Sequence, residues 1–256
     1  MSGTFAPPGE CFTIMQIDLD DLAAAYSHRP ASAAGVARAQ RAGESVGLTP
    51  GDVALDIGGG RGRHAAAWLE TGAVPLVIDP ASGMTREAAS VPGVVPVRAA
   101  AQALPLRDQC ARLAYFHLSI HYGDWRRSLR EVRRVVASGG ECWIWTMDEQ
   151  HHRDSFLARW FPSVGDIDAA RFPDPSAVAS FLESVGGRVT TGKEVETKTR
   201  PVAEWRAAVV ARFVSTLQLI PADEFAKGLA AFDAVYPDPT ASVEYLLTFD
   251  WIRARL

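Results

Sequence analysis

The sequence predicts an α/β protein, a three-layer sandwich with helices on both faces of a mainly parallel, seven-stranded sheet whose C-terminal strand is antiparallel. Three observations support this fold class. Short apolar runs alternate with helical patterns from residue 52 onward, a glycine cluster directly follows the first apolar run, and the last residues alternate as in a strand. This order is typical of repeated strand–helix–strand units.

Size and composition are sufficient for one such domain, because 48% of the 256 residues are hydrophobic. We expect residues 1–18 to form a flexible arm and residues 19–256 a single domain. The net charge of -4 does not favour nucleic acid or an anionic membrane as a partner. Since no apolar run is long enough for membrane insertion and no secretory signal begins the chain, we expect a cytoplasmic location. The sequence leaves the oligomeric state unspecified.

Each predicted strand is a short apolar or alternating run bounded by turn residues. The first run ends at the glycine cluster, and most later runs are separated by stretches long enough for a helix. The strands are expected at 52–57, 74–78, 94–97, 113–117, 141–146, 188–198 and 243–251.

The predicted helices carry apolar side chains at helical spacing. Between the fourth and fifth strands, Trp125, Leu129 and Val132 share one helical face, and Gly139 and Gly140 are expected to end this helix. The arginines on its other faces fit a solvated surface better than a phosphate site. Further helices are expected at 176–185, from Trp205 to Leu217 and from Phe225 to Phe232.

Residues 148–174 follow neither period and are predicted to be a long irregular connection. Such a connection in a compact domain is usually functional or mobile. We expect residues 148–174 and 200–236 to cover a binding site for a small organic molecule, because both segments are rich in apolar and aromatic side chains.

The glycine cluster is the first candidate binding element. Gly58, Gly59 and Gly60 follow a buried strand and precede a helical pattern, so backbone N–H groups can point at a polar ligand. Residues 60–65 also satisfy the dinucleotide pattern GxGxxG/A, which keeps a nicotinamide or flavin enzyme under consideration.

Two acidic residues help to separate these readings. Asp56 lies in the strand just before the glycines, where a carboxylate would repel a pyrophosphate but suit a ligand with an ammonium group. Asp79 ends the second strand, where a carboxylate can accept hydrogen bonds from ribose hydroxyls. A helix-capping role for Asp56 and a turn role for Asp79 are the structural alternatives.

Four segments in this order resemble the class I, Rossmann-like S-adenosylmethionine-dependent methyltransferases, particularly the group that includes the ubiquinone and menaquinone biosynthesis enzymes. The segments are VALDIGGGRGRHA at 53–65, VIDPASGM at 77–84, AAAQALPL at 99–106 and HLSIHYGDWRRSLREVRRVVASGGE at 117–141. One such segment would be weak support, but four in order are specific. The resemblance implies methyl transfer from S-adenosylmethionine.

The resemblance also implies how this cofactor is held. Asp56 and the glycine loop would hold its methionine end, Asp79 its ribose, and residues near 100–102 its adenine. Tyr26 and Arg29 resemble a Tyr-x-x-Arg-Pro segment that relatives fold over the cofactor, with surface packing as the alternative. The remaining expected cofactor contacts are Pro80, Met84, Ala101, Gln102 and His117.

One departure concerns adenine. Relatives usually carry Gly-Asp-Ala-Glu where this chain has Ala99, Ala100, Ala101 and Gln102, so Ala100 replaces the acid expected to accept from the adenine amino group. The amide oxygen of Gln102 or backbone groups would have to serve instead.

Methyl transfer from a sulfonium is a direct displacement, so alignment of the acceptor and exclusion of water are the main requirements. O-methylation is slightly favoured, and an oxygen acceptor benefits from a base. His121 is the preferred base, because it follows the fourth strand and imidazole titrates near neutrality, although a structural role is equally consistent. Acceptor contacts are expected from Tyr122, His151, Trp160, Phe172 and Trp205. The aromatic side chains among them could instead complete the core.

No metal site is predicted, because the three cysteines are widely spaced and adjacent His151 and His152 seldom converge on one ion. Two other functions remain open. A degenerate methyltransferase-like scaffold is favoured by Ala100 and opposed by Asp56 and Asp79. A nicotinamide-dependent oxidoreductase is less favoured, since it gives Asp56 no role.

Overall fold

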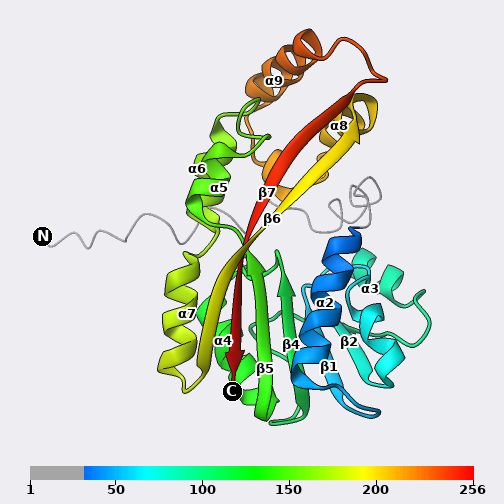
Figure 1. Ribbon diagram of the computed structural model, residues 1–256, viewed down its shortest axis with the longest axis vertical. Helices are drawn as coiled ribbons and strands as arrows, with labels where there is room; N and C mark the ends of the chain where they lie inside the picture. Colours follow the sequence, from blue (N-terminus) through cyan, green and yellow to red (C-terminus); the bar gives the residue numbers. More distant parts are fainter. Residues whose placement is uncertain (1–31) are drawn as a thin grey trace, which may run out of the picture.

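The computed structural model describes residues 32–256, which form a seven-stranded sheet with the strand order β3-β2-β1-β4-β5-β7-β6 (Figure 1). The predicted arm, residues 1–18, lies outside the described residues. The strands are β1 (Val53–Ile57), β2 (Val74–Asp79), β3 (Val95–Arg98), β4 (Ala111–His117), β5 (Val136–Thr146), β6 (Arg188–Pro201) and β7 (Ser242–Arg255). All seven predicted strands are present.

Strand direction divides the sheet into two parts. Strands β1 to β5 pair in parallel, whereas β7 pairs antiparallel with both β5 and β6. The predicted mainly parallel sheet with an antiparallel C-terminal strand is therefore confirmed. Because parallel strands end at the same edge, the carboxyl ends of β1, β2 and β4 lie together, which is where open α/β sheets bind ligands.

Helices cover both faces of the sheet, so the predicted three-layer architecture is confirmed. On one face, Leu129 and Val132 of α4 (Trp125–Val135) pack with Val178 and Leu182 of α7 (Pro175–Ser184) against the strands. The other face is covered by α2 (Ala33–Val46), the 3-10 helix η3 (Ala65–Thr71) and α3 (Ser82–Ala88). Trp68 of η3 anchors this second layer, since it is fully buried and donates a 2.7 Å hydrogen bond to the Ala39 carbonyl of α2.

Four local predictions were wrong. Gly139 and Gly140 lie inside β5 and do not end the preceding helix, which stops at Val135, and the helix predicted from Trp205 to Leu217 ends at Val210. Residues 148–174 are not irregular: they contain α5 (Glu149–Asp154) and α6 (Ser163–Arg171). Asp148 caps α5 by accepting the His151 N–H at 2.8 Å, but polar side chains fill this short helix, so no apolar stripe marks it. The glycine cluster opens turns and then a 3-10 helix in place of an α-helix.

A second lobe, residues 149–171 and 201–245, lies beyond the end of the parallel strands (Figure 1). It forms because β6 and β7 continue past the sheet as a long hairpin and carry α8 (Val202–Val210), η4 (Ser215–Gln218) and α9 (Ala222–Val235) between them. Trp205 and Phe232 stack with ring centroids 4.2 Å apart in its own apolar core. The lobe is thus packed separately from the sheet.

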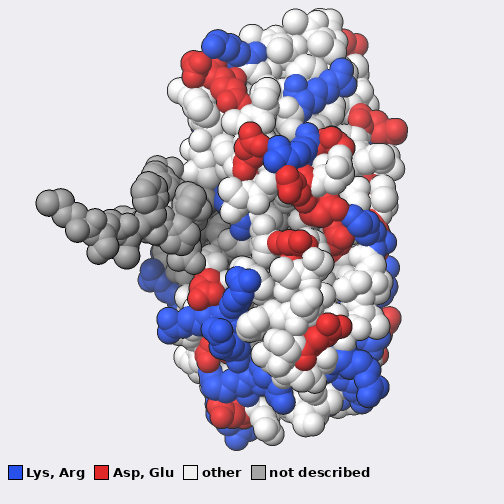
Figure 2. All heavy atoms as spheres, turned by 90° about the vertical axis from the view of Figure 1, so that its left-hand side faces the viewer, with Lys and Arg blue, Asp and Glu red and all other residues white. Residues whose placement is uncertain are grey.

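Charges on the surface are mixed in sign. Figure 2 shows Lys and Arg side chains gathered on the lower part of one face, where Figure 1 places α4 and α7, with acidic side chains among them. In this region Arg134 forms ion pairs with Asp108 and Glu131. Within residues 32–256, none of the helices combines the length and apolar character needed to cross a bilayer.

Candidate active site

The glycine loop joins β1 to the turns before η3. Gly58 and Gly60 have φ values of 69° and 54°, a region that favours glycine. A Cβ at Gly59 would lie 2.4 Å from Cγ of Asp56, so this position has no room for a side chain. The loop backbone is therefore free to lie directly against a ligand.

Asp56 is buried behind this loop, with only 1% of its surface exposed. Neither carboxylate oxygen has a hydrogen bond of normal geometry with any described residue. Burial raises the pKa of Asp56 to about 7, the Ala65 N–H opposes this shift, and the nearby charge of Asp79 adds to it. A buried carboxyl with so little hydrogen bonding is costly, and a cation placed beside it would relieve that cost.

Asp79 fixes the position of the loop. Its Oδ2 accepts the Gly60 N–H at 3.0 Å, and its Oδ1 accepts the Ala81 N–H at 2.9 Å. A carboxylate offers about four acceptor positions, so hydroxyl groups of a ligand can still bind to the same oxygens. Asp79 can thus shape the loop and contact a ligand at once.

These elements enclose a first cavity of about 200 Å³ at the carboxyl edge of the sheet. Asp56 lies behind the glycine loop that forms one wall of this cavity, and its side chain does not line the cavity. Tyr26 and Arg29 lie outside the described residues. The other residues expected to contact the cofactor line this cavity: Gly58, Gly59, Gly60, Asp79, Pro80, Met84, Ala101, Gln102 and His117. One site thus collects residues that are far apart in sequence.

Ala100, Ala101 and Gln102 form one end of the first cavity. The Gln102 amide donates through Nε2 to the Tyr122 carbonyl at 3.0 Å. This bond uses one of the two N–H donors of the amide and leaves the amide oxygen as an acceptor. The local geometry is therefore compatible with the Gln102 amide oxygen accepting a hydrogen bond in place of the acid that Ala100 replaces.

A second cavity of about 430 Å³ lies between the sheet edge and the second lobe. It shares Ser32, His117, Leu118 and Tyr122 with the first cavity, so the two meet there. Five residues predicted to act on or contact an acceptor line it: His121, Tyr122, His151, Phe172 and Trp205.

Trp160, also expected to contact an acceptor, does not line the second cavity. It is 7% exposed and packs in the core of the second lobe, with its ring 5.3 Å from that of Phe232. The sequence could not separate this position from the cavity positions, because both are aromatic and lie in the same segment.

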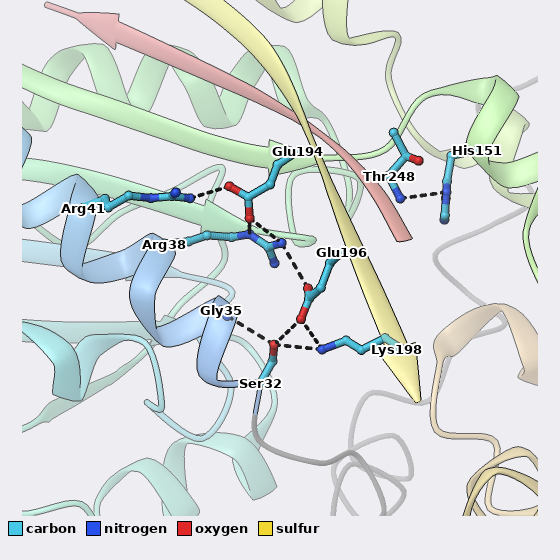
Figure 3. A network of polar contacts seen from close by, with 9 residues as sticks. All are labelled: Ser32, Gly35, Arg38, Arg41, His151, Glu194, Glu196, Lys198 and Thr248. Carbon is cyan, nitrogen blue, oxygen red and sulfur yellow. Dashed lines mark hydrogen bonds and ion pairs between the residues drawn. The ribbon is translucent and has the colours of Figure 1, made fainter. Parts of the chain in front are cut away.

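The histidines at the second cavity differ in character. His121 stacks on Phe172 with ring centroids 3.8 Å apart and lies beside Tyr122. Burial lowers the pKa of His152 to about 4, and the neighbouring His151 contributes in the same direction. Burial also lowers the pKa of His151, whose Nδ1 accepts the Thr248 N–H at 3.2 Å (Figure 3). His151 and His152 are therefore neutral near pH 7 and weak as bases.

A polar network that the sequence analysis missed forms one wall of the second cavity (Figure 3). Arg38 of α2 is 1% exposed and donates to Glu194 at 2.9 Å and to Glu196 at 3.0 Å on β6. Lys198 pairs with Glu196 and donates to the Ser32 hydroxyl at 3.1 Å. The sequence did contain a signal for this network: charged residues occupy alternate positions of β6, and alternate residues of a strand lie on the same face.

Within residues 32–256, no three His, Cys, Asp or Glu side chains converge in a way that could hold a metal ion. The expectation that the protein uses no metal stays a prediction.

Comparison with known sequences gives three findings. Residues 55–144 match the methyltransferase domain family. An uncharacterized methyltransferase of Mycobacterium tuberculosis is 29% identical over 153 residues, 59% of this chain and 56% of that protein. A ubiquinone/menaquinone biosynthesis C-methyltransferase of Acidiphilium cryptum is 34% identical over 99 residues, 34% of this chain and 38% of that protein. The chain thus aligns with 56% of the length of the first relative and 38% of the length of the second.

Solved structures share the fold over most of the chain. A protein of Anabaena variabilis, described as a methyltransferase of an antibiotic biosynthesis pathway, superposes with a TM-score of 0.67 at 21% identity, covering 86% of this chain and 97% of that one. The YcgJ protein of Bacillus subtilis gives a TM-score of 0.62 at 17% identity, and the superposition covers 87% of this chain and 98% of that one. A geranyl diphosphate methyltransferase solved with S-adenosylmethionine gives a TM-score of 0.52 at 16% identity, and the superposition covers 86% of this chain and 85% of that one.

Proposed function

Since residues 55–144 match the methyltransferase domain family and the fold is shared with solved methyltransferases, we propose that the chain binds S-adenosylmethionine and transfers the methyl group to a small organic molecule. The observation that carries this proposal is the buried carboxyl of Asp56 behind a glycine loop, which accepts no hydrogen bond of normal geometry from residues 32–256. An ammonium group such as that of a methionine moiety would supply its missing partner.

The first cavity fits the rest of this cofactor. Gly58, Gly59 and Gly60 would lie against its methionine part, and the Asp79 carboxylate would accept its ribose hydroxyls. Met84 and Pro80 add contact area on the same wall. Ala101 and the amide oxygen of Gln102 would face the adenine, so the residue that replaces the usual acid need not prevent binding. Tyr26, Arg29 and His117 complete the proposed cofactor contacts.

The second cavity is the proposed acceptor site. When bound, the sulfonium supplies an activated methyl group, and the protein has to align the acceptor with it and exclude water. Tyr122 and His117 stand where the two cavities meet, so an acceptor in the second cavity can reach the methyl group there. Phe172 and Trp205 give this site an apolar lining, which suits a small organic molecule.

His121 is the proposed base for an oxygen acceptor, and O-methylation is the preferred reaction on this account. His121 lines the second cavity beside Tyr122, whereas His151 and His152 are held neutral and weakly basic by burial. As base, His121 would take the hydroxyl proton while the acceptor oxygen forms its bond to the methyl carbon and the carbon–sulfur bond breaks.

The two segments that cover the acceptor site, residues 148–174 and 200–236, are proposed to open for entry and close before transfer. Their helices form the second lobe, whose apolar core is separate from that of the sheet. A lobe held mainly by its own contacts and one hairpin can move as a unit.

Two other functions make different use of the same residues. A methyltransferase-like scaffold would have no need for a buried carboxyl that costs stability. A nicotinamide-dependent oxidoreductase would place a pyrophosphate at the glycine loop, close to the negative charge of Asp56.

Methyl transfer is tested by incubating the purified protein with S-adenosylmethionine carrying a deuterated methyl group and a mixture of candidate phenols, alcohols and amines. We expect a labelled product by mass spectrometry and a raised melting temperature with S-adenosylhomocysteine, since a ligand at about 100 times its Kd adds about 2.7 kcal/mol. A thermal shift without any labelled product would favour the scaffold. A shift with NADP alone would favour the oxidoreductase.

A further inference from the structure

One buried charge at the second cavity, that of Arg200, has no hydrogen-bonding or ion-pair partner among residues 32–256. The face of β6 that looks toward α2 and the cavity carries four charged residues at alternate positions: Glu194, Glu196, Lys198 and Arg200. The first three are paired with Arg38, Arg41 or one another (Figure 3). Arg200 makes no ion pair or hydrogen bond from its side chain with any residue in 32–256.

Arg200 is also deeply enclosed. It is 8% exposed and lines the second cavity, and its Nε is buried without a hydrogen-bond acceptor. Its guanidinium carbon lies 5.9 Å from the centroid of the Phe213 ring. A buried guanidinium without a counter-ion is expensive, so a ligand that supplies the negative charge would be bound favourably.

The acidic groups at this cavity do not fill that role. Glu196 is engaged by Arg38 and Lys198. Asp168 is held by Arg171 at 3.3 Å and by the Thr216 hydroxyl at 2.6 Å. Glu204 is exposed to solvent and forms no ion pair with Arg200. Among residues 32–256, no acidic side chain at this cavity therefore pairs with Arg200.

The surroundings of Arg200 define the rest of that ligand. Phe156, Trp205, Phe213 and Tyr245 line the same cavity, which extends to Tyr122 at the junction with the first cavity. A guanidinium binds carboxylates and phosphates with two parallel hydrogen bonds. Resting on the proposed methyl transfer, we infer that Arg200 recognises a carboxylate or phosphate group of an acceptor whose apolar body lies among these aromatic side chains.

The anion preference is tested with three eight-carbon probes that differ only in their polar end: octanoate, monooctyl phosphate and 1-octanol. Calorimetry is run with and without saturating S-adenosylhomocysteine. We expect at least one anion to bind tenfold or more tightly than 1-octanol, and Arg200→Met to remove this difference. Arg200→Lys should keep part of it. The relative affinity of octanoate and monooctyl phosphate identifies which anion the site prefers.

Arg206→Met is the matched control, because Arg206 is on α8, is 46% exposed and pairs with Asp233 away from the cavity. It should leave all three affinities unchanged. Arg200→Met should melt at the wild-type temperature or above it without ligand, since an unpaired buried charge is removed. Loss of folding in Arg200→Met, but not in the control, would mark Arg200 as structural and overturn the inference.

Equal binding of 1-octanol and both anions to the wild-type protein would also overturn it. Failure of S-adenosylhomocysteine to bind would instead contradict the proposed methyl transfer. The anion preference measured in the absence of S-adenosylhomocysteine would still test the role of Arg200. The two ideas therefore fail by different results.

Discussion

Asp56 is the residue whose ionisation should depend most on a bound ligand. Burial holds its pKa at about 7, well above the usual value for an aspartic acid. The motif identified this residue from the sequence, but its burial and lack of a partner follow from the packed fold. Arg200, in contrast, was not identified from the sequence. A charged residue at one of several alternating charged positions in a strand gives no indication that it is buried without an ion-pair partner.

Affinity for S-adenosylhomocysteine should fall as pH falls through about 7. Below that pH the free protein carries a protonated Asp56, and an ammonium group needs the ionised form, so binding must release a proton. The Kd should rise by up to about tenfold per pH unit below this point. Calorimetry at about pH 5.5 to 8.5, in buffers of different ionisation enthalpy, measures both the Kd and the proton release.

Asp56→Asn should weaken binding at about pH 8 and flatten this pH profile. Asp52→Asn is the control, since Asp52 directly precedes β1, at the end away from the glycine loop, and its carboxylate accepts hydrogen bonds from Thr49. It should keep the wild-type profile. An unchanged profile in Asp56→Asn would mean that another group titrates and that the ammonium is held elsewhere.

At the scale of elements, periodicity identified the strands and the helices that have an apolar face. It missed α5 and α6, because a short helix that packs within a small lobe needs no continuous stripe. It also could not show that β6 and β7 continue beyond the sheet to carry that lobe. Their length becomes visible only when the two strands are paired across residues 188–201 and 242–255.

Trp160→Ala should destabilise the second lobe and leave the sheet intact. Trp160 is buried in the core of the lobe, where loss of a large aromatic side chain typically costs about 3–5 kcal/mol. By hydrogen exchange, we expect lost protection in 202–235 and unchanged protection in β1 and β4. Affinity for S-adenosylhomocysteine should stay within about threefold of wild type.

Phe172→Ala is the matched variant, because Phe172 is half-buried, lines the second cavity and stacks on His121. It should keep the exchange protection of the lobe and change only the binding of probes in the second cavity. If Trp160→Ala exposes the sheet as much as the lobe, the two form one cooperative unit and a separately moving cover is excluded.

At the scale of the whole molecule, two cavities meet at the carboxyl edge of one sheet. The first is made of segments that follow consecutive strands, so motif order in the sequence was enough to predict most of its lining. The second is enclosed by α2, β6 and the second lobe, which come together only through long-range packing. Sequence reasoning therefore found acceptor contacts as single aromatic residues and missed the charged wall around Arg38.

The most direct test of the account is a calorimetric titration of the protein with S-adenosylhomocysteine and with NADP. We expect S-adenosylhomocysteine to bind and NADP to give no binding heat. Asp79→Ala should weaken S-adenosylhomocysteine at least tenfold, about 1.4 kcal/mol, whereas Asp223→Ala on the exposed face of α9 should leave it unchanged. Tight binding of NADP with no response to S-adenosylhomocysteine would contradict the account.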